Sequence, residues 1–320
     1  MTDLKQTDVT AVPRFANVAT FMRSQLRDTP EGLDIALFGV PLDLGSSFRS
    51  GARHGPAQVR EMSRLIREVN YSTKIAPFDL CDIADIGDAP VNSLDMDASL
   101  RSIQQFVQTV LSAGARPLAI GGDHTISLPI LRSMATDEAL AIIQVDAHSD
   151  TQDLMLGKKY ASGTPFRRAI EEGLIDPRKT VQVGIRGTLF SVDELDWALA
   201  QGITIIDMDE FEALGAVEAA RKARRVVAGS DCYLTFDIDA LDPGVAPGAG
   251  GLEPGGISAR QAQVFLRGLR GIPIVGADVV EVSPPLDPSG GTALVAANLM
   301  FELLCLLAER HRKVSVQASG

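Results

Sequence analysis

Short apolar runs recur along the chain and are separated by segments with helical periodicity. The segments between the runs, such as 100–114 and 258–271, carry apolar residues at helical spacing. Short apolar runs are typical of buried strands. Strands that alternate with helices indicate a mostly parallel sheet that is covered on both faces. We therefore predict an α/β fold, a three-layer αβα domain with a mostly parallel eight-stranded sheet; a closed (β/α)8 barrel is the alternative. The eight predicted strands are 34–40, 79–86, 116–120, 140–146, 180–185, 203–208, 232–239 and 273–282.

The two ends of the chain differ in character. Residues 1–30 are predicted to be an N-terminal extension of a single domain over residues 1–320, packed on that domain or on a neighbouring subunit. The first ten residues are polar and lack the apolar core of a secretory signal. The apolar segment 293–308 contains Asn298 and Glu302, and it is too short and too polar to span a bilayer. We expect a buried helix there and no membrane partner.

Composition limits the class of protein. The chain of 320 residues is 45% hydrophobic with a formal net charge of −11, which argues against a nucleic-acid partner because such proteins present a basic surface. The three cysteines are far apart and form no CxxC pair, as expected in a reducing compartment. We therefore expect a cytoplasmic protein.

Histidine and carboxylate side chains follow four of the predicted strands. "GGDHT" with His124 follows the strand at 116–120, and "DAHSD" ends the strand at 140–146. "DIDALDP" ends the strand at 232–239, and "EVSPP" ends the last predicted strand. Because the carboxyl ends of parallel strands meet at one edge of a sheet, we expect these groups to lie close together.

The spacing within these motifs favours a metal site. Alternate residues of an extended chain point to the same side, so Asp146, His148 and Asp150 can converge, as can Asp237 and Asp239. Clustered carboxylates repel one another unless cations neutralise them. Mixed Asp and His ligands suit Mn(II), with Ni(II), Co(II) or Zn(II) as alternatives. The number of candidate ligands exceeds what one tetrahedral zinc needs, so two divalent ions with bridging carboxylates fit better. Each motif alone is more often a helix cap or turn, and their combination carries the prediction.

At these residues the sequence resembles the ureohydrolase (arginase/agmatinase) family. "GGDHTIS", "DAHSD", "TFDIDALDP" and "EVSPP" are similar to its metal-site signatures and occur in the family's order, and the similarity runs over almost the whole chain. The segments "RSGARHGP" and "TPFRRAIEE" resemble the agmatinase and guanidinobutyrase branch more than they resemble arginase. The motifs are specific for the family and much less specific for the substrate.

The resemblance implies an arginase-type fold, a homotrimer or homohexamer, and hydrolysis of a small guanidino compound. Guanidinobutyrate or agmatine would be cleaved to urea and an amine, with Glu281 binding the guanidinium group. Water activated by the two ions would attack the guanidinium carbon while Asp150 accepts a proton. The implied ligands of one ion are His124, Asp146, Asp150 and Asp237, and those of the other are Asp146, His148, Asp237 and Asp239.

Three departures from the family pattern bear on the substrate. "KYASGTPF" has Ser162 where the family usually has a histidine, and a hydroxyl cannot replace imidazole as a general acid. The segment "PGAGGLEPGG" has Ala249, Gly251 and Leu252 in place of threonine and proline, and Leu286 replaces a common tyrosine. We predict that Ser162, Leu252 and Leu286 line a more apolar substrate pocket.

These departures leave alternatives open. One is a hydrolase of N-alkylated guanidines, biguanides or guanylurea, with Ni(II) as the native metal. Another is a catalytically impaired subunit of a hetero-oligomer, which rests on Ser162. A third is a single-zinc deacetylase on a similar fold, which the retention of both His124 and Asp239 disfavours.

Overall fold

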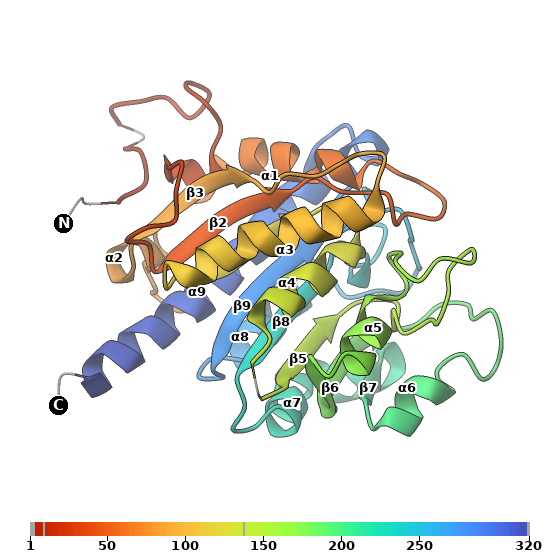
Figure 1. The fold of residues 1–320 in the computed structure, drawn as a ribbon. Helices are drawn as coiled ribbons and strands as arrows, with labels where there is room; N and C mark the ends of the chain where they lie inside the picture. The colour runs from red at the N-terminus through yellow and green to blue at the C-terminus, as the bar shows by residue number, and fades with distance from the viewer. Residues whose placement is uncertain (1–3, 9, 137, 319–320) are drawn as a thin grey trace.

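The computed structural model describes residues 4–8, 10–136 and 138–318 and shows one central sheet between two layers of helices (Figure 1). The nine strands lie in the order β1-β3-β2-β4-β9-β8-β5-β6-β7, and every neighbouring pair is parallel. The sheet is open, with β1 and β7 at its edges, so the barrel alternative does not apply. The strands are β1 (Gln25–Leu26), β2 (Ile35–Val40), β3 (Ile83–Asp88), β4 (Arg116–Gly121), β5 (Leu140–Val145), β6 (Ile175–Ile185), β7 (Thr204–Asp207), β8 (Cys232–Asp237) and β9 (Ile274–Val280).

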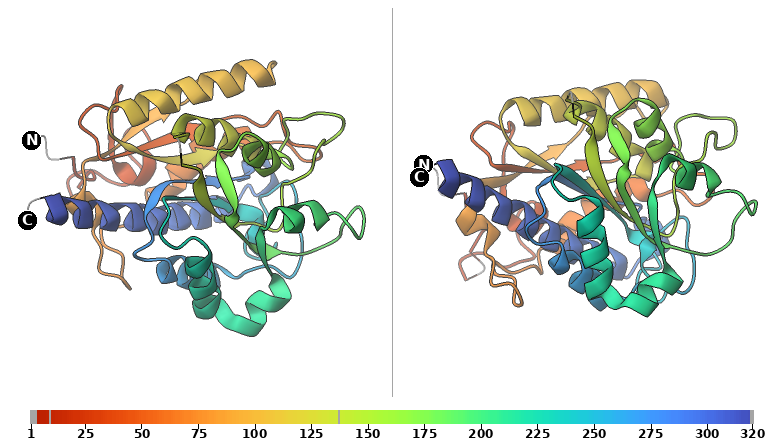
Figure 2. Two further views of the ribbon diagram at one scale, coloured as in Figure 1. Left: turned by 60° about the horizontal axis from the view of Figure 1, so that its bottom comes forward. Right: turned by 90° about the horizontal axis from the view of Figure 1, so that it is seen from below.

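Helices cover both faces of the sheet. Helices α3, α4 and α5 lie on one face, and α1, α7, α8 and α9 lie on the other (Figures 1 and 2). The α-helices are α1 (Gly55–Ser63), α2 (Pro77–Leu80), α3 (Met96–Ser112), α4 (Ser127–Met134), α5 (Pro165–Glu171), α6 (Asp196–Gln201), α7 (Met208–Val226), α8 (Ala259–Gly268) and α9 (Gly291–Ala318). The 3-10 helices are η1 (Phe21–Arg23), η2 (Ala52–His54), η3 (His124–Ile126), η4 (Ile238–Ala240) and η5 (Pro284–Leu286).

The strands alternate their side chains between the two helical layers. In β2, Ile35 and Leu37 pack into the core under α1 and α9, whereas Ala36, Phe38 and Val40 pack into the core under α3 and α4. Both sets are fully buried, which is why this strand reads as an uninterrupted apolar run rather than as an alternating one. The three-layer αβα prediction is confirmed.

The strand count differs from the prediction by one. Each of the eight predicted strands overlaps a strand of the sheet, but β1 was missed. It has only two residues, Gln25 and Leu26, both exposed, and it pairs with β3 at the edge of the sheet. Two exposed residues carry no periodic signal, so the predicted eight-stranded sheet is corrected to nine strands.

Part of the N-terminal extension is held firmly on the domain. Phe21 and Met22 are fully buried. Arg23 donates hydrogen bonds from Nη1 to the carbonyls of Arg64 and Ile66, in the segment that follows α1. The contact of residues 1–30 with a neighbouring subunit stays a prediction.

Helix α9 is a core element. Its segment Gly291–Arg310 is long and apolar enough to cross a membrane by composition, yet 78% of that window is buried inside the protein. It lies along β4 and β9 and packs against α1 and α8. A helix buried to this extent by its own protein is the core helix that the sequence predicted.

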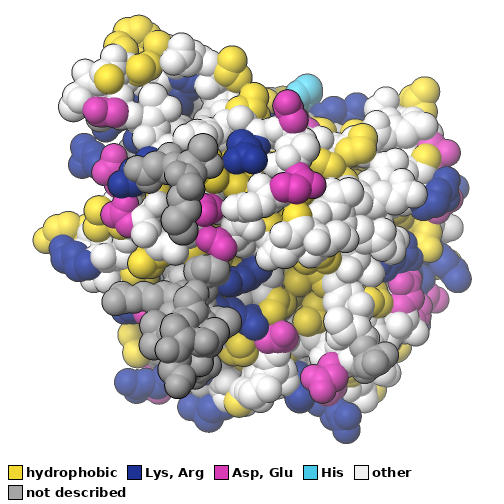
Figure 3. Space-filling model, turned by 60° about the vertical axis from the view of Figure 1, so that its left-hand side comes forward, with side chains coloured by type: hydrophobic (Ala, Val, Ile, Leu, Met, Phe, Trp, Pro, Cys, Tyr) yellow, Lys and Arg dark blue, Asp and Glu magenta, His cyan; other side chains and the backbone are white. Residues whose placement is uncertain are grey.

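The face that carries both chain ends has mixed charge. Figure 3 shows Lys and Arg interspersed with Asp and Glu among the described side chains of this face, with apolar side chains between them. Phe15, Val18 and Tyr71 are among the exposed large apolar residues of the protein.

Candidate active site

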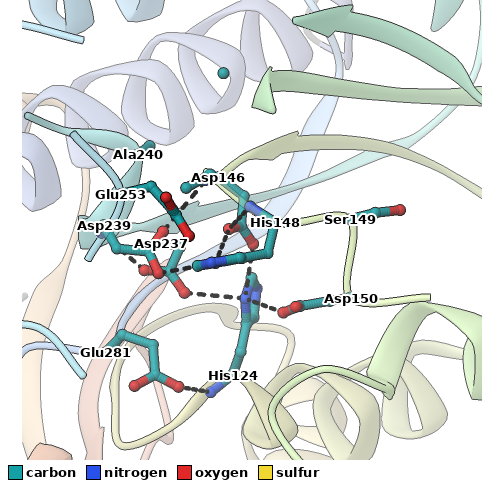
Figure 4. Close-up of polar contacts among 12 residues, drawn as sticks. His124, Asp146, His148, Ser149, Asp150, Asp237, Asp239, Ala240, Glu253 and Glu281 are labelled. Carbon is teal, nitrogen blue, oxygen red and sulfur yellow. Dashed lines mark hydrogen bonds and ion pairs between the residues drawn. The ribbon is translucent and has the colours of Figure 1, made fainter. Parts of the chain in front are cut away.

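Four neighbouring strands in the middle of the sheet deliver the predicted residues to one edge. Strands β4, β9, β8 and β5 are consecutive in the sheet, although they are not consecutive in the chain. His124 begins η3 just after β4, Glu281 follows β9, Asp237 ends β8 and Asp146 follows β5. Figure 4 shows these side chains converging from their separate strands. The clustering expected at the carboxyl edge of the sheet is therefore present.

His124 stands at the centre of a buried set of carboxylates. Its Nδ1 lies 3.1 Å from Asp146 Oδ2, 2.9 Å from Asp150 Oδ2 and 3.2 Å from Asp237 Oδ2. This Nδ1 atom is buried and has no hydrogen-bond partner among the described residues. A ring nitrogen lone pair and three carboxylate oxygens that converge without hydrogen-bond geometry are a donor set for a divalent cation.

His148 forms a second, more open group beside the first. Its Nδ1 lies 3.1 Å from Asp239 Oδ2 and 3.6 Å from Asp146 Oδ1. Asp146 thus directs one carboxylate oxygen to each histidine, as a bridging ligand would. The side chain of His148 is 38% exposed, whereas that of His124 is fully buried. Five of the six residues predicted as ligands therefore form two adjoining groups that could each hold an ion. The sixth, Asp150, lies beside the first group through His124.

The pKa shifts in this cluster show which charge it favours. Burial, together with the charge of Asp146, raises the pKa of Asp150 to about 6. Burial alone would lower the pKa of His124, but the carboxylates of Asp146, Asp150 and Asp237 raise it well above the ordinary imidazole range. Burial likewise raises the pKa of Asp237 well above its ordinary range. The cluster stabilises positive charge between its carboxylates, as a divalent cation supplies it.

Hydrogen bonds from neighbouring groups orient the carboxylates. Asp146 Oδ2 accepts from Gln144 Nε2 at 2.8 Å, and its Oδ1 accepts from the backbone nitrogen of His148 at 2.7 Å. Asp239 Oδ1 accepts from the backbone nitrogen of Ala147 at 3.2 Å. Asp237 Oδ1 accepts from the backbone nitrogen of Asp239 at 2.8 Å. These donors hold both oxygens of Asp146 and one oxygen each of Asp237 and Asp239 in place.

A buried network beneath His124 was missed from the sequence. His124 Nε2 lies 2.8 Å from Thr235 Oγ1. Asp278 Oδ2 accepts hydrogen bonds from Ser127 and Tyr233, each at 2.7 Å. Burial raises the pKa of Asp278, and hydrogen bonds from Thr235, Ser127 and Tyr233 oppose that rise. An Nε2–H held by Thr235 leaves the Nδ1 lone pair of His124 facing the carboxylates. The sequence did contain one signal for this network, because Asp278 is the only charged residue within the apolar run "IVGADVV".

Two of the site carboxylates belong to residues with unusual backbone conformation. Asp150 has φ of 52° and Glu281 has φ of 65°, both in the left-handed region that residues with a β-carbon rarely adopt. Such conformations cost on the order of 1–3 kcal/mol each and are maintained only where the surrounding structure imposes them. Both residues turn their carboxylates into the same site, so the fold sustains this strain at the place where the chemistry is.

A cavity of about 500 Å³ opens onto the cluster. Its wall includes His148, Asp150, Asp239 and Glu281, together with the predicted substrate-binding residues Ser162 and Leu252. Leu286 lies in η5, half-buried, and is not part of the cavity wall. The wall also includes two arginines that sequence reasoning missed, Arg49 and Arg186.

Comparison with known proteins shows the family to which this chain belongs. The model of the Arginase family matches residues 33–306. The chain belongs to the arginase family. The guanidinopropionase of Pseudomonas aeruginosa is 52% identical over 94% of this chain and 95% of its own length, and the guanidinobutyrase of the same organism is 43% identical over 92% and 94%. The structure of proclavaminate amidinohydrolase from Streptomyces clavuligerus superposes with a TM-score of 0.89 at 39% identity, covering 93% of this chain and 99% of that one.

Membership of the arginase family confirms the resemblance drawn from the four strand-end motifs. The chain is a hydrolase of this family, and its fold is the arginase-like three-layer fold. Enzymes of this family work with two metal ions, and the two His/Asp groups around His124 and His148 are the part of this chain that fits such a pair.

Proposed function

We propose that this hydrolase cleaves the guanidino group of a small guanidino acid, releasing urea and an amino acid. The observation that carries this proposal is the 52% identity to a guanidinopropionase over nearly the full length of both chains. The similar guanidinobutyrase also has a name that specifies a guanidino acid. The guanidinobutyrate prediction from the sequence is thus retained, and guanidinopropionate becomes an equally suitable substrate.

Glu281 is the residue that we assign to the guanidinium group. Its Oε1 accepts a hydrogen bond from the backbone nitrogen of His124 at 2.9 Å, which fixes the carboxylate beside the metal ligands. It borders the cavity, although burial raises its pKa well above the ordinary glutamate range. A planar guanidinium cation matches a carboxylate bidentately and supplies the charge that this buried group needs.

The roles of the metal ligands follow from the two groups. Two divalent ions, which we propose to be Mn(II), supply Lewis acidity that polarises bound water and lowers its pKa. Asp150 places its Oδ2 at 2.9 Å from His124 Nδ1 and borders the cavity, so it can accept the proton that the attacking water loses. The water oxygen bonds to the guanidinium carbon, the bond from that carbon to the tail nitrogen breaks, and the proton passes to the leaving amine.

The acidic tail of the substrate requires a cation on the cavity wall. Arg186 donates from Nε, Nη1 and Nη2 to backbone carbonyls, so its hydrogen-bonding capacity is used within the protein. Arg49 donates from Nε to the carbonyl of Gly250 and from Nη2 to that of Ala249, and its Nη1 makes no hydrogen bond among the described residues. We therefore assign the carboxylate of the tail to Arg49.

An aminated tail, as in agmatine, is the second candidate. The same cavity wall includes Glu194 and Glu253, whose carboxylates can pair with an ammonium group. The sequence predicted agmatine as a substrate from the resemblance to the agmatinase branch, and these two carboxylates on the cavity wall support that candidate. A comparison of substrates distinguishes the acidic tail from the aminated one.

Ser162 supports no acid–base role in this scheme. Its hydroxyl donates to the carbonyl of Gly45 at 3.3 Å, and its backbone nitrogen donates to the same oxygen at 3.1 Å. The residue therefore ties the loop at Gly45 to the segment before α5. A catalytically impaired subunit would need more than this replacement, because the groups around His124, His148 and Glu281 are otherwise complete.

The test is a screen of urea release after reconstitution with Mn(II) and, separately, with Ni(II). We expect kcat/KM for 3-guanidinopropionate and 4-guanidinobutyrate to exceed that for agmatine by at least about tenfold. The ammonium tail of agmatine would face the cation of Arg49, and such a charge mismatch costs more free energy than the one methylene by which the two acids differ. We expect Arg49→Gln to lower kcat/KM for the acids and to leave agmatine nearly unchanged. Preference for agmatine, or hydrolysis of no guanidino compound, would contradict the proposal. Metal analysis should give two ions per chain; one ion would favour a single-zinc enzyme.

We also propose a homotrimer or homohexamer in the cytoplasm. The three cysteines are unpaired and buried, as suits a reducing compartment. Phe15, Val18 and Tyr71 expose apolar surface that subunit contact would cover. Light scattering on the purified protein tests the assembly, and a second chain that co-purifies in fixed ratio would favour the hetero-oligomer.

A further inference from the structure

Two adjacent glycines form the wall of the cavity between Glu281 and His148. A β-carbon built at Gly250 would lie 3.9 Å from Glu281 Oε2. One built at Gly251 would lie 3.1 Å from His148 Cε1 and 3.5 Å from Asp239 Oδ2. The backbone of this pair therefore passes from the guanidinium-binding carboxylate to the more open metal group, beside the place where the reacting carbon must sit.

The two glycines are present for different reasons. At Gly250 a β-carbon would lie 2.8 Å from the backbone oxygen of Arg49, so close packing of two backbones requires glycine there. At Gly251 the φ angle lies outside the left-handed region, and the nearest atom to a β-carbon is the ring edge of His148. No turn and no backbone contact requires glycine at position 251. A β-carbon at this position would press on the His148 ring unless the ring shifted by a few tenths of an ångström. Without a side chain at position 251, the cavity reaches the ring of His148.

We propose that Gly251 admits an alkyl substituent on the guanidino nitrogen nearest to His148, so that N-methylated guanidino acids are substrates as well. This inference rests on the proposed function and specifies its substrate class further. Water adds its oxygen to the guanidinium carbon, and the bond from that carbon to the tail nitrogen breaks. The tail amine takes the proton, and the second product is N-methylurea instead of urea.

The neighbouring wall suits an apolar substituent. Leu252 follows directly, borders the cavity and packs against the main hydrophobic core. Met155 and Phe190 border the same cavity. A guanidino acid of nine heavy atoms fills about 270 Å³ at roughly 30 Å³ per heavy atom, the volume share of a liquid water molecule. The cavity of about 500 Å³ therefore has room for additional methyl groups.

The experiment compares 3-guanidinopropionate with its analogue that carries one methyl group on a terminal guanidino nitrogen. It uses the metal-loaded full-length enzyme and the variants Gly251→Ala and Gly251→Thr, with the products identified as urea or N-methylurea by mass spectrometry. We expect the wild type to hydrolyse both substrates with kcat/KM values within about tenfold of each other, because a methyl group that finds room costs little. We expect Gly251→Thr to lower kcat/KM for the methylated substrate at least about 20-fold and that for the unmethylated one less than about threefold, with Gly251→Ala in between.

The matched control is Gly163→Ala on another part of the wall. A β-carbon there would lie 3.2 Å from Gln152 Oε1, so it should change the two substrates by the same factor. Metal content is measured for every variant, because a side chain at 251 that displaces His148 would remove an ion.

Three outcomes overturn the inference. A wild type that hydrolyses the unmethylated acid but discriminates against the methylated one by more than about 100-fold shows that the space is not used. Equal losses for both substrates in Gly251→Thr, or loss of an ion, show that Gly251 serves the metal centre instead of selectivity. If the wild type hydrolyses neither acid, the proposed function itself is contradicted.

Discussion

The two metal groups share Asp146 but differ in how they are built. His124 is fully buried, packs edge-on against Phe166 at 5.1 Å between ring centroids, and has its Nε2 held by Thr235. Its Nδ1 faces three carboxylates within 3.2 Å. His148 is 38% exposed to the cavity, and its Nδ1 meets two carboxylates at 3.1 and 3.6 Å. One group is part of the protein core and the other is part of the cavity wall.

This difference separates two tasks. The buried group is fixed by strand ends and by the polar network beneath it, so we expect it to govern whether a metal centre assembles. The open group borders the wall at Gly251, so we expect it to influence what can approach the reacting carbon. We therefore expect substitutions at the buried group to affect metal binding and stability together, and those at the open group to affect mainly one ion and substrate selection.

The largest expected effect is that of His124→Asn. Asparagine cannot reach the three carboxylates as an imidazole does, so one ion should be lost. We expect kcat/KM to fall by roughly 10³-fold or more, because a catalytic ion contributes several kcal/mol of transition-state stabilisation. Elemental analysis and urea release measure both quantities. Near-normal metal content and rate would refute the assignment of His124.

His148→Asn is the matched substitution at the open group. It should also remove one ion, but the melting temperature of its metal-free form should stay nearer to that of the wild type, since His148 is partly exposed and His124 is not. Equal melting temperatures for the two metal-free variants would remove the distinction between a core group and a wall group.

A smaller effect is expected for Asp278→Asn, a residue that acts on the metal through Thr235 and His124. Loss of the carboxylate should weaken the binding of one of the two ions by roughly 10- to 100-fold, as measured by calorimetric titration of the metal-free protein. Tyr233→Phe removes only one donor to Asp278 and should have a smaller effect on the same ion. If both variants destabilise the fold equally and leave the affinities for both metal ions unchanged, the network supports the core rather than the orientation of His124.

The smallest effect is expected for Ser162→His on the cavity wall. We expect kcat/KM for ordinary guanidino acids or agmatine to rise by roughly three- to tenfold relative to kcat/KM for N-alkylated guanidines. This is well below the rate enhancement of about 10²- to 10⁴-fold that a fully positioned general acid provides. Ser162→Ala, which removes only the hydroxyl bonded to Gly45, is the control. An unchanged substrate profile in Ser162→His would show that position 162 does not determine specificity.

The fold was largely predictable because its strands are buried on both faces. Runs such as 35–40 and 140–145 are apolar at every position, and the alternation with helices follows from that pattern. What failed was the edge strand β1, whose two exposed residues lack any pattern. Side-chain placement was less predictable: Ser162 and Leu252 border the cavity, whereas Leu286 lies in η5 away from its wall.

The sequence by itself determined the candidate metal ligands and the family, because both are encoded locally. Asp146, His148 and Asp150 share one side of an extended segment, and the strand-end motifs keep their order along the chain. The tertiary structure alone decided that β9 lies between β4 and β8, which places Glu281 against His124. It also decided that Thr235 holds His124 across 111 residues and that Gly251 borders His148. Such contacts depend on how strands pair in space, and hydrophobic periodicity carries no record of that pairing.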